Sequence, residues 1–158
     1  MKYQYSFSLG LLKPTILSIL LVCGLFEVGF AAQCSTADPI LISEKKGMTF
    51  AEITAGFAGG TIDTSGNVTG DVAAYKGQIN PGQVQIDACK GEIITYSFVD
   101  GTLTNGSQTM SLTILTSPGS VTMPASGRLT LDVEASLNVG GLQDPGDYTG
   151  NYTIIVNY

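Results

Sequence analysis

The stretch Asp147-Tyr148-Thr149-Gly150-Asn151-Tyr152-Thr153-Ile154-Ile155-Val156-Asn157-Tyr158 decides the fold, because its residues alternate between two chemically different faces. Side chains alternate across a β-strand, and Tyr, Ile, Val and Thr suit a pleated, half-buried surface. We therefore expect a long strand that completes a sheet, in this molecule or in a neighbouring one. Its apolar and aromatic face consists of Tyr148, Gly150, Tyr152, Ile154, Val156 and Tyr158.

Residues 128–139 show the cleanest alternation in the chain. The odd-numbered positions are apolar and the even-numbered positions are polar or charged. A helix would separate the apolar residues over several faces, whereas a strand gathers them on one. The pattern predicts a single strand with one face in a core and one in water. The apolar positions are Leu129, Leu131, Val133, Ala135, Leu137 and Val139.

Several shorter segments alternate in the same way, and turn signals separate them at intervals of about ten residues. Residues 83–88, 93–98 and 110–115 are predicted strands. Residues 56–70 are rich in glycine and are predicted to be mainly turns, with Ser65-Gly66-Asn67 as a hairpin tip. No segment of residues 32–158 has a helical period. These features predict an all-β fold, an immunoglobulin-like (Greek-key) two-sheet β-sandwich.

The first thirty residues have the composition of a signal peptide. Lys2 and Lys13 give a positive start, an apolar run follows, and small residues precede Ala32. The alternative is a membrane anchor, but the run has about eleven apolar residues where roughly twenty are needed to span a bilayer. We expect residues 1–31 to be a signal peptide cleaved between Ala31 and Ala32, and residues 32–158 to form a single domain with no membrane span. The predicted location is the periplasm, the cell surface or the extracellular medium.

Two cysteines, Cys34 and Cys89, remain after this cleavage. An even pair in an exported protein predicts a disulfide, and the alternative is two free buried thiols. The bridge would close a 55-residue loop and contribute about 4 kcal/mol on the chain-entropy model. The remaining chain has five basic and twelve acidic residues, so its net charge is −7. This charge argues against a nucleic acid partner.

The chain carries no recognisable catalytic site. It has no histidine, which excludes Ser-His-Asp and Cys-His catalysis. Asp132 and Glu134 lie on the polar face of a predicted strand and are interpreted as solvated groups. Residues 63–71 place oxygen side chains at alternate positions around Gly66, which would suit calcium, but these are also ordinary turn residues. We predict no enzyme activity, no cofactor and no metal site.

The C-terminal residues also carry a family resemblance. Gln143, the turn Pro145-Gly146, Tyr148-Thr149-Gly150 and the closing Asn157-Tyr158 resemble the ending of an exported bacterial family catalogued as domain of unknown function four-four-zero-two. The ending is also similar to the last strand of spore-coat-U-type proteins and chaperone–usher pilins, which are small β-sandwiches. In pilins the groove beside this strand receives a strand from a chaperone or from the next subunit. The resemblance therefore implies that the face from Tyr148 to Tyr158 borders a strand-addition site.

Two functions remain open from the sequence. The leading hypothesis is a secreted bacterial β-sandwich with a structural or cell-surface role, in its sharpest form a pilin-like, fimbrial-type subunit. Its partners would be other copies of itself or a periplasmic chaperone. A donor arm would have to lie within residues 32–47, where only Ile40 and Ile42 alternate. In the self-contained version, the last strand closes its own sandwich beside residues 128–139. The alternative function is an extracellular binding or adhesion module that recognises carbohydrate or uses calcium.

Overall fold

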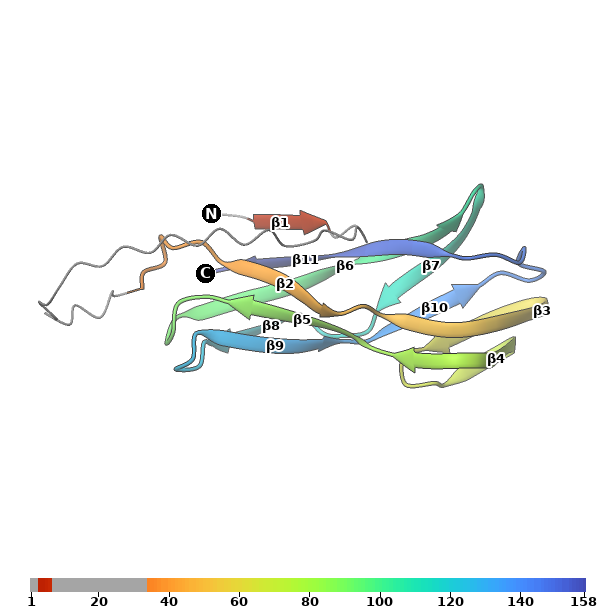
Figure 1. Ribbon diagram of the computed structural model, residues 1–158, viewed down its shortest axis with the longest axis horizontal. Helices are drawn as coiled ribbons and strands as arrows, with labels where there is room; N and C mark the ends of the chain where they lie inside the picture. The colour runs from red at the N-terminus through yellow and green to blue at the C-terminus, as the bar shows by residue number, and fades with distance from the viewer. Residues whose placement is uncertain (1–2, 7–33) are drawn as a thin grey trace, which may run out of the picture.

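The computed structural model describes residues 3–6 and 34–158, and this part of the chain consists of strands and turns without a helix. The strands lie roughly along one long axis, so the molecule is elongated (Figure 1). The strands are β1 (Tyr3–Ser6), β2 (Leu41–Lys46), β3 (Thr49–Asp63), β4 (Val68–Asn80), β5 (Gly82–Asp87), β6 (Ile93–Asn105), β7 (Gln108–Ile114), β8 (Gly119–Thr122), β9 (Arg128–Val133), β10 (Ala135–Val139) and β11 (Thr149–Asn157).

The strands form two antiparallel sheets, which confirms the predicted all-β, two-sheet sandwich. The larger sheet has eight strands in the order β1-β11-β6-β7-β10-β3-β4, and β8 pairs with β6 beside β7. The smaller sheet has the order β2-β5-β9. The chain passes between the sheets at several points, from β2 to β3, from β4 to β5 and from β9 to β10.

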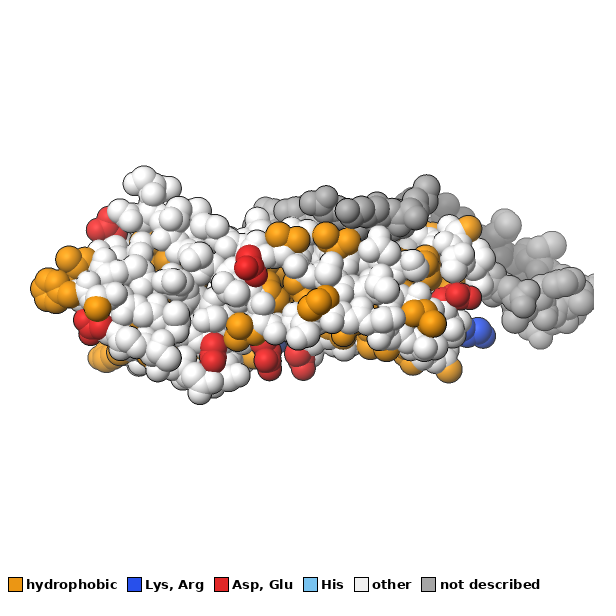
Figure 2. All heavy atoms as spheres, turned by 180° about the vertical axis from the view of Figure 1, so that it is seen from behind, with side chains coloured by type: hydrophobic (Ala, Val, Ile, Leu, Met, Phe, Trp, Pro, Cys, Tyr) orange, Lys and Arg blue, Asp and Glu red, His pale blue; other side chains and the backbone are white. Residues whose placement is uncertain are grey.

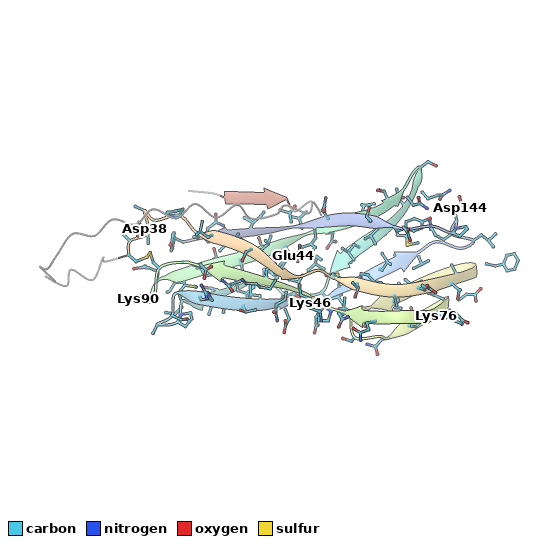
Figure 3. The ribbon with its side chains drawn as sticks, viewed as in Figure 1. Asp38, Glu44, Lys46, Lys76, Lys90 and Asp144 are labelled. Atoms are coloured by element: carbon cyan, nitrogen blue, oxygen red, sulfur yellow. A yellow bond between two sulfur atoms is a disulfide. The ribbon has the colours of Figure 1, made fainter. Side chains whose placement is uncertain are left out.

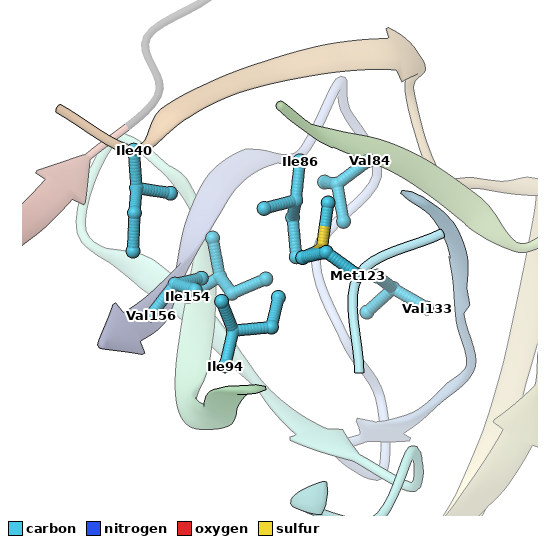
Figure 4. Packing of buried hydrophobic residues seen from close by; sticks show 8 residues of the cluster. All are labelled: Ile40, Val84, Ile86, Ile94, Met123, Val133, Ile154 and Val156. Carbon is cyan, nitrogen blue, oxygen red and sulfur yellow. The ribbon is translucent and has the colours of Figure 1, made fainter. Parts of the chain in front are cut away.

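A hydrophobic core fills the space between the two sheets (Figure 4). The smaller sheet contributes Val84 and Ile86 from β5, and the larger sheet contributes Ile154 and Val156 from β11. Each of these four side chains is fully buried. The remaining members of the core are Ile40, Ile94, Met123 and Val133.

A second apolar cluster lies on the larger sheet alone, over β3, β7 and β10. Its buried members are Phe50, Ile62, Met110, Leu112, Ala135, Leu137 and Val139. No strand of the three-stranded sheet contributes to this set. Tyr152 and Met48 pack against both clusters and so connect the two halves of the molecule.

Residues 128–139 form two strands, and the prediction of one continuous strand is wrong. β9 pairs with β5 in the small sheet, whereas β10 pairs with β7 and β3 in the large sheet. The change occurs at Glu134, whose N–H donates to Thr116 Oγ1 at 2.7 Å, and the next N–H, of Ala135, donates to Thr64 Oγ1 at 3.1 Å. These hydroxyls accept the hydrogen bonds of backbone groups at the point where one ladder ends and the next begins. The alternation survives the crossing, so Val133 and residues 135, 137 and 139 are all buried.

The glycine-rich region of residues 56–70 is also different from the prediction. Its glycines lie inside the long strands β3 and β4, although Ser65-Gly66-Asn67 does form the predicted hairpin tip. Gly59 has φ +67° and lies against the backbone of Val139 and Gly140, where a Cβ would clash. The glycines therefore mark a bulge and close backbone contacts within strands rather than a series of turns.

Candidate functional site

The candidate strand-addition site is the outer edge of β11. On one side, β11 pairs antiparallel with β6 from Thr149 to Asn157, with an irregularity between Asn151 and Thr153. On its other side, residues 153–156 pair antiparallel with β1 (Figure 1). The neighbour of β11 within the domain is β6, so the prediction that β11 lies beside residues 128–139 is wrong. The reason is that residues 128–139 are used elsewhere: β10 is paired on both sides, with β7 and β3, and β9 belongs to the small sheet.

The predicted face of β11 points towards the interior to different degrees. Ile154 and Val156 are fully buried, Tyr148, Tyr152 and Tyr158 are half-buried, and Gly150 is exposed. A Cβ at Gly150 would collide with the backbone of Thr102 and Leu103, so close pairing with β6 requires a glycine there. Because the apolar side chains are used in the core, the outer edge offers mainly its backbone. Its role in strand addition stays a prediction.

The three tyrosines of this face are each fixed by a different environment. At the start of the strand, Gln143 Nε2 donates to Tyr148 Oη at 2.8 Å, and the Tyr148 hydroxyl donates to the Asp144 carbonyl at 2.8 Å. In the middle, burial raises the pKa of Tyr152 to about 12, with a smaller contribution from the negative charge of Glu44. The strand is therefore tied at its start and packed at its centre.

The third tyrosine connects the end of β11 to the disulfide. Cys34 and Cys89 form a disulfide with a Cα–Cα distance of 5.3 Å, which confirms the predicted bridge and rules out two free thiols. The N–H of Cys89 donates to Tyr158 Oη at 3.2 Å. The bridge and the C-terminal strand thus stabilise the same end of the molecule, and Asp38 and Lys90 mark that end in Figure 3.

The possible calcium ligands of residues 63–71 lie on a hairpin, with the turn at residues 64–67 and Asp71 on β4. Asp63 Oδ1 accepts hydrogen bonds from the N–H groups of Ser65 and Asn67, both at 2.9 Å, and Oδ2 accepts one from Asn67 Nδ2 at 2.8 Å. The amide of Asn67 and these backbone donors lower the pKa of the Asp63 carboxyl below its ordinary value. Both carboxylate oxygens are therefore already used in the turn.

The other acidic groups considered from the sequence are also placed by the structure. Asp132 on β9 accepts a hydrogen bond from Gln83 Nε2 at 2.9 Å, and Glu134 is exposed at the crossing between the sheets. Within residues 3–6 and 34–158, three grouped candidate metal ligands occur only at Cys34, Asp38 and Cys89. Two of these three are joined in the disulfide. The absence of enzyme activity stays a prediction.

The predicted cleavage site at Ala31 and Ala32 lies outside the described residues. In the part of the chain that the structure covers, no helix is long and apolar enough to cross a membrane. The disulfide is compatible with export, because such bridges persist in oxidising compartments.

A cavity that the sequence did not indicate lies at the end of the molecule opposite the disulfide. Its volume is about 970 Å³, and it lies between residues 48–55 and the loop of residues 143–148. Figure 3 shows Asp144, one of the lining residues, at that end. One wall includes part of β4, a strand that was not predicted from the sequence because most of its residues are exposed and do not alternate. Sequence periodicity detects buried faces, so it had no signal for this wall.

These features define an all-β, disulfide-bridged sandwich in which the last strand, β11, is second from the edge of the larger sheet, with β1 outside it. Over residues 40–158 the chain matches the family described as "Domain of unknown function (DUF4402)", and it belongs to that family. Neither the curated proteins nor the solved structures gave a match to the chain. The family and the fold fit a structural module.

Proposed function

We propose that the protein is an exported structural subunit of the bacterial cell surface, pilin-like in that the outer edge of β11 receives a strand from another polypeptide. The observation that carries this proposal is the pairing of β1 with residues 153–156 of β11. β1 lies within the predicted signal peptide. Its removal on export would leave the hydrogen-bonding groups of this edge without a partner.

The composition of β11 supports a functional edge. The strand reads Thr-Gly-Asn-Tyr-Thr-Ile-Ile-Val-Asn and contains neither a charged residue nor a proline. Natural proteins commonly protect a free edge strand from pairing with charges, proline or a bulge. β11 has an irregularity only between Asn151 and Thr153, outside the segment that pairs with β1. Residues 153–156 therefore remain suited to backbone pairing.

In this proposal the chain receives a strand and does not donate one from residues 32–47. After the predicted cleavage only two residues precede Cys34, which is bridged to Cys89. Ile40 is fully buried in the core, and Ile42 lies on β2, which pairs with β5 of the same molecule. Releasing this segment would expose core side chains and remove a strand from the small sheet. The added strand is therefore supplied by a periplasmic chaperone or by a different segment of a partner subunit.

Site-specific photocrosslinking in the producing bacterium tests the proposal. A photoreactive amino acid at Ile155, next to the edge of β11, is expected to give an adduct that maps to an extended segment of one partner polypeptide. The matched control is the same group at Leu115, which is 49% exposed between β7 and β8. An absence of adducts at position 155, or equal adducts at both positions, would contradict the proposal.

A second candidate is the extracellular binding module that the sequence left open. The favouring observation is Tyr75, which lines the cavity and is 70% exposed, as an aromatic platform for a carbohydrate would be. The calcium form is less well supported, because the carboxylate of Asp63 is engaged in its turn. Addition of millimolar calcium is therefore expected to leave the melting temperature unchanged. A clear rise in the melting temperature would instead support a calcium-binding module.

A further inference from the structure

The cavity at the end opposite the disulfide is bordered by the edge of a strand. Residues 48–55 are eight consecutive positions, and all of them line the cavity. Side chains alternate between the two faces of a strand, so a cavity against one face would be lined by every second residue. The lining here is consecutive, in a segment whose register with β4 shifts twice, so the backbone edge of β3 is identified from the strand pairing.

This edge is unpaired within the described part of the chain. β4 pairs with β3 on one side from Thr49 to Ile62, whereas β10 pairs with β3 on the other side only from Gly60 to Asp63. The nearest other backbone bond joins the N–H of Leu142 to the carbonyl of Gly56 at 2.9 Å. Residues 49–55 therefore pair with a strand on one side and face the cavity with the other.

The backbone at this edge is bent by a bulge. Ala51 has φ +64°, which is strained for a residue with a Cβ, and the pairing register with β4 shifts on both sides of Glu52. Bulges of this kind are frequent at sheet edges, where they change the direction in which side chains point.

The opposite wall of the cavity is held firmly in place. The loop of residues 143–148 is fixed by a hydrogen bond from Gln108 Nε2 to Asp144 Oδ2 at 2.7 Å and by the contacts of Tyr148 described above. The floor between the walls is apolar and includes Leu137 and Met110, which are 2% and 8% exposed. The site is thus a preformed trough with a backbone edge, an apolar floor and a fixed rim.

The rim of the trough is acidic. Among the described residues that line it, Glu52, Asp144 and Asp147 carry carboxylates, and none is a lysine or an arginine. The ion pair that the described residues form, between Arg128 and Asp87 at 2.8 Å, lies on the small sheet. On the face shown in Figure 2, acidic side chains are more prominent than basic ones. The chemistry of the rim therefore favours a cationic partner.

From these observations we infer that the trough is a second strand-addition site, which binds an extended polypeptide segment with alternating apolar and basic residues. The backbone of the segment pairs with residues 49–55 of β3. Its apolar side chains lie on the floor, and its lysine or arginine side chains reach Glu52 and Asp147. This is recognition by β-augmentation, in which main-chain hydrogen bonds supply affinity and alternate side chains supply specificity. The inference does not depend on the function of β11.

Binding of synthetic nonapeptides to the purified protein tests this inference. A peptide that alternates valine and lysine is expected to bind saturably, as followed by fluorescence anisotropy. A peptide that alternates valine and glutamate should not bind, because it brings like charges to the rim. Methylation of alternate backbone nitrogens of the first peptide, on the edge that faces β3, should weaken binding at least about tenfold, because it removes several hydrogen bonds.

The double variant E52Q/D147N tests the role of the rim. It is expected to weaken binding of the valine–lysine peptide about 2- to 30-fold, with a smaller effect at high salt. The matched control is E92Q, which removes one exposed carboxylate in the turn before β6 and should bind as the unmodified protein does.

The location of binding decides between the two edges. Amide chemical shifts are expected to change in residues 48–55 and 143–148. Shifts confined to residues 153–157 would place the peptide on β11 and overturn the inference, without affecting the proposal for β11 itself. The inference would also be overturned if the backbone-methylated peptide bound as tightly as the unmethylated one. A third contrary result is a protein that binds neither the valine–lysine nor the valine–glutamate peptide but binds an oligosaccharide in the trough.

Discussion

Replacement of Ile154 by alanine is the most direct perturbation of the contact between the two sheets. Ile154 is fully buried in the core between the sheets, on the inward face of β11. The substitution removes three methyl or methylene groups, which corresponds to about 2.4 kcal/mol of transfer free energy at about 0.8 kcal/mol per group. The cavity left behind adds to this cost, so the free energy of unfolding should fall by about 3–4 kcal/mol.

Equilibrium unfolding in urea, followed by far-ultraviolet circular dichroism with the disulfide intact, measures this change. The transition midpoint should move to lower urea concentration with an unchanged slope. Ile155→Ala is the matched control, since the side chain of Ile155 points to the opposite face of β11 from that of Ile154 and is only half-buried. It should cost about 1 kcal/mol or less. Equal costs for the two variants, or a near-zero cost for Ile154→Ala, would refute the assignment of the inward face.

Three further predictions concern the disulfide and two titrating groups. Replacement of Cys34 and Cys89 by serine should lower the free energy of unfolding by up to about 4 kcal/mol, as measured by urea unfolding, and an unchanged stability would contradict a closed 55-residue loop. Ultraviolet titration should show a tyrosine that ionises near pH 12 and disappears in Tyr152→Phe. The pKa of Tyr152 in the folded protein is raised to about 12, whereas in the unfolded chain it is about 10. The contribution of the protonated Tyr152 to the free energy of unfolding is therefore complete below pH 10 and is lost as the pH rises through 12. Arg128 holds the pKa of the Asp87 carboxyl below its ordinary value, so this stabilisation is present above about pH 4 and is lost as the pH falls through the folded pKa. Asp87→Asn should therefore flatten the acid side of the stability profile, and an unchanged profile would contradict the ion pair.

The sequence predicted the parts of the fold that depend on burial of one strand face. Ile154 and Val156 of β11, and Val133 and Leu137 of β9 and β10, occupy the core as their alternation indicated. Periodicity reports which side of a strand is apolar, and both sheets bury one side. The two-sheet sandwich could be predicted for this reason, and the disulfide followed from the count of cysteines.

The sequence did not reveal where the chain changes sheets. The alternation runs through Glu134 without a break, because the residues on both sides of the crossing face the same interior. The crossing depends on hydrogen bonds that the N–H groups of Glu134 and Ala135 donate to the hydroxyls of Thr116 and Thr64, which are more than fifteen residues away in the chain. Such contacts leave no local pattern, so a continuous strand was the natural but wrong interpretation.

The candidate sites were predictable to unequal degrees. The face of β11 was visible as an alternating motif, but its neighbour β6 was not, because strand pairing is a long-range property. The trough beside β3 had no sequence signal, since which backbone edge is left unpaired depends on long-range strand pairing. Glycine-rich strands such as β3 also resemble loops in composition, although here Gly59 and Gly60 allow close contacts between strands.

Apolar side chains are also exposed at the end of the molecule that contains the trough. Phe57 and Leu142 are 84% and 63% exposed, and the bond from Leu142 N–H to Gly56 places their backbones close together. Hydrophobic side chains gather at this end in Figure 2. Leu142 has φ +53°, a conformation that costs free energy for a leucine.

Hydrogen–deuterium exchange at residues 153–156 tests the central claim, that the outer edge of β11 is open after export and receives a strand. The measurement compares the exported protein with a variant whose cleavage at Ala31 is blocked, so that β1 remains attached. The account predicts that about half of these amides, those that face outward, exchange faster in the exported protein, while the amides bonded to β6 stay protected in both. Identical protection in the two forms would contradict the claim that this edge accepts a strand.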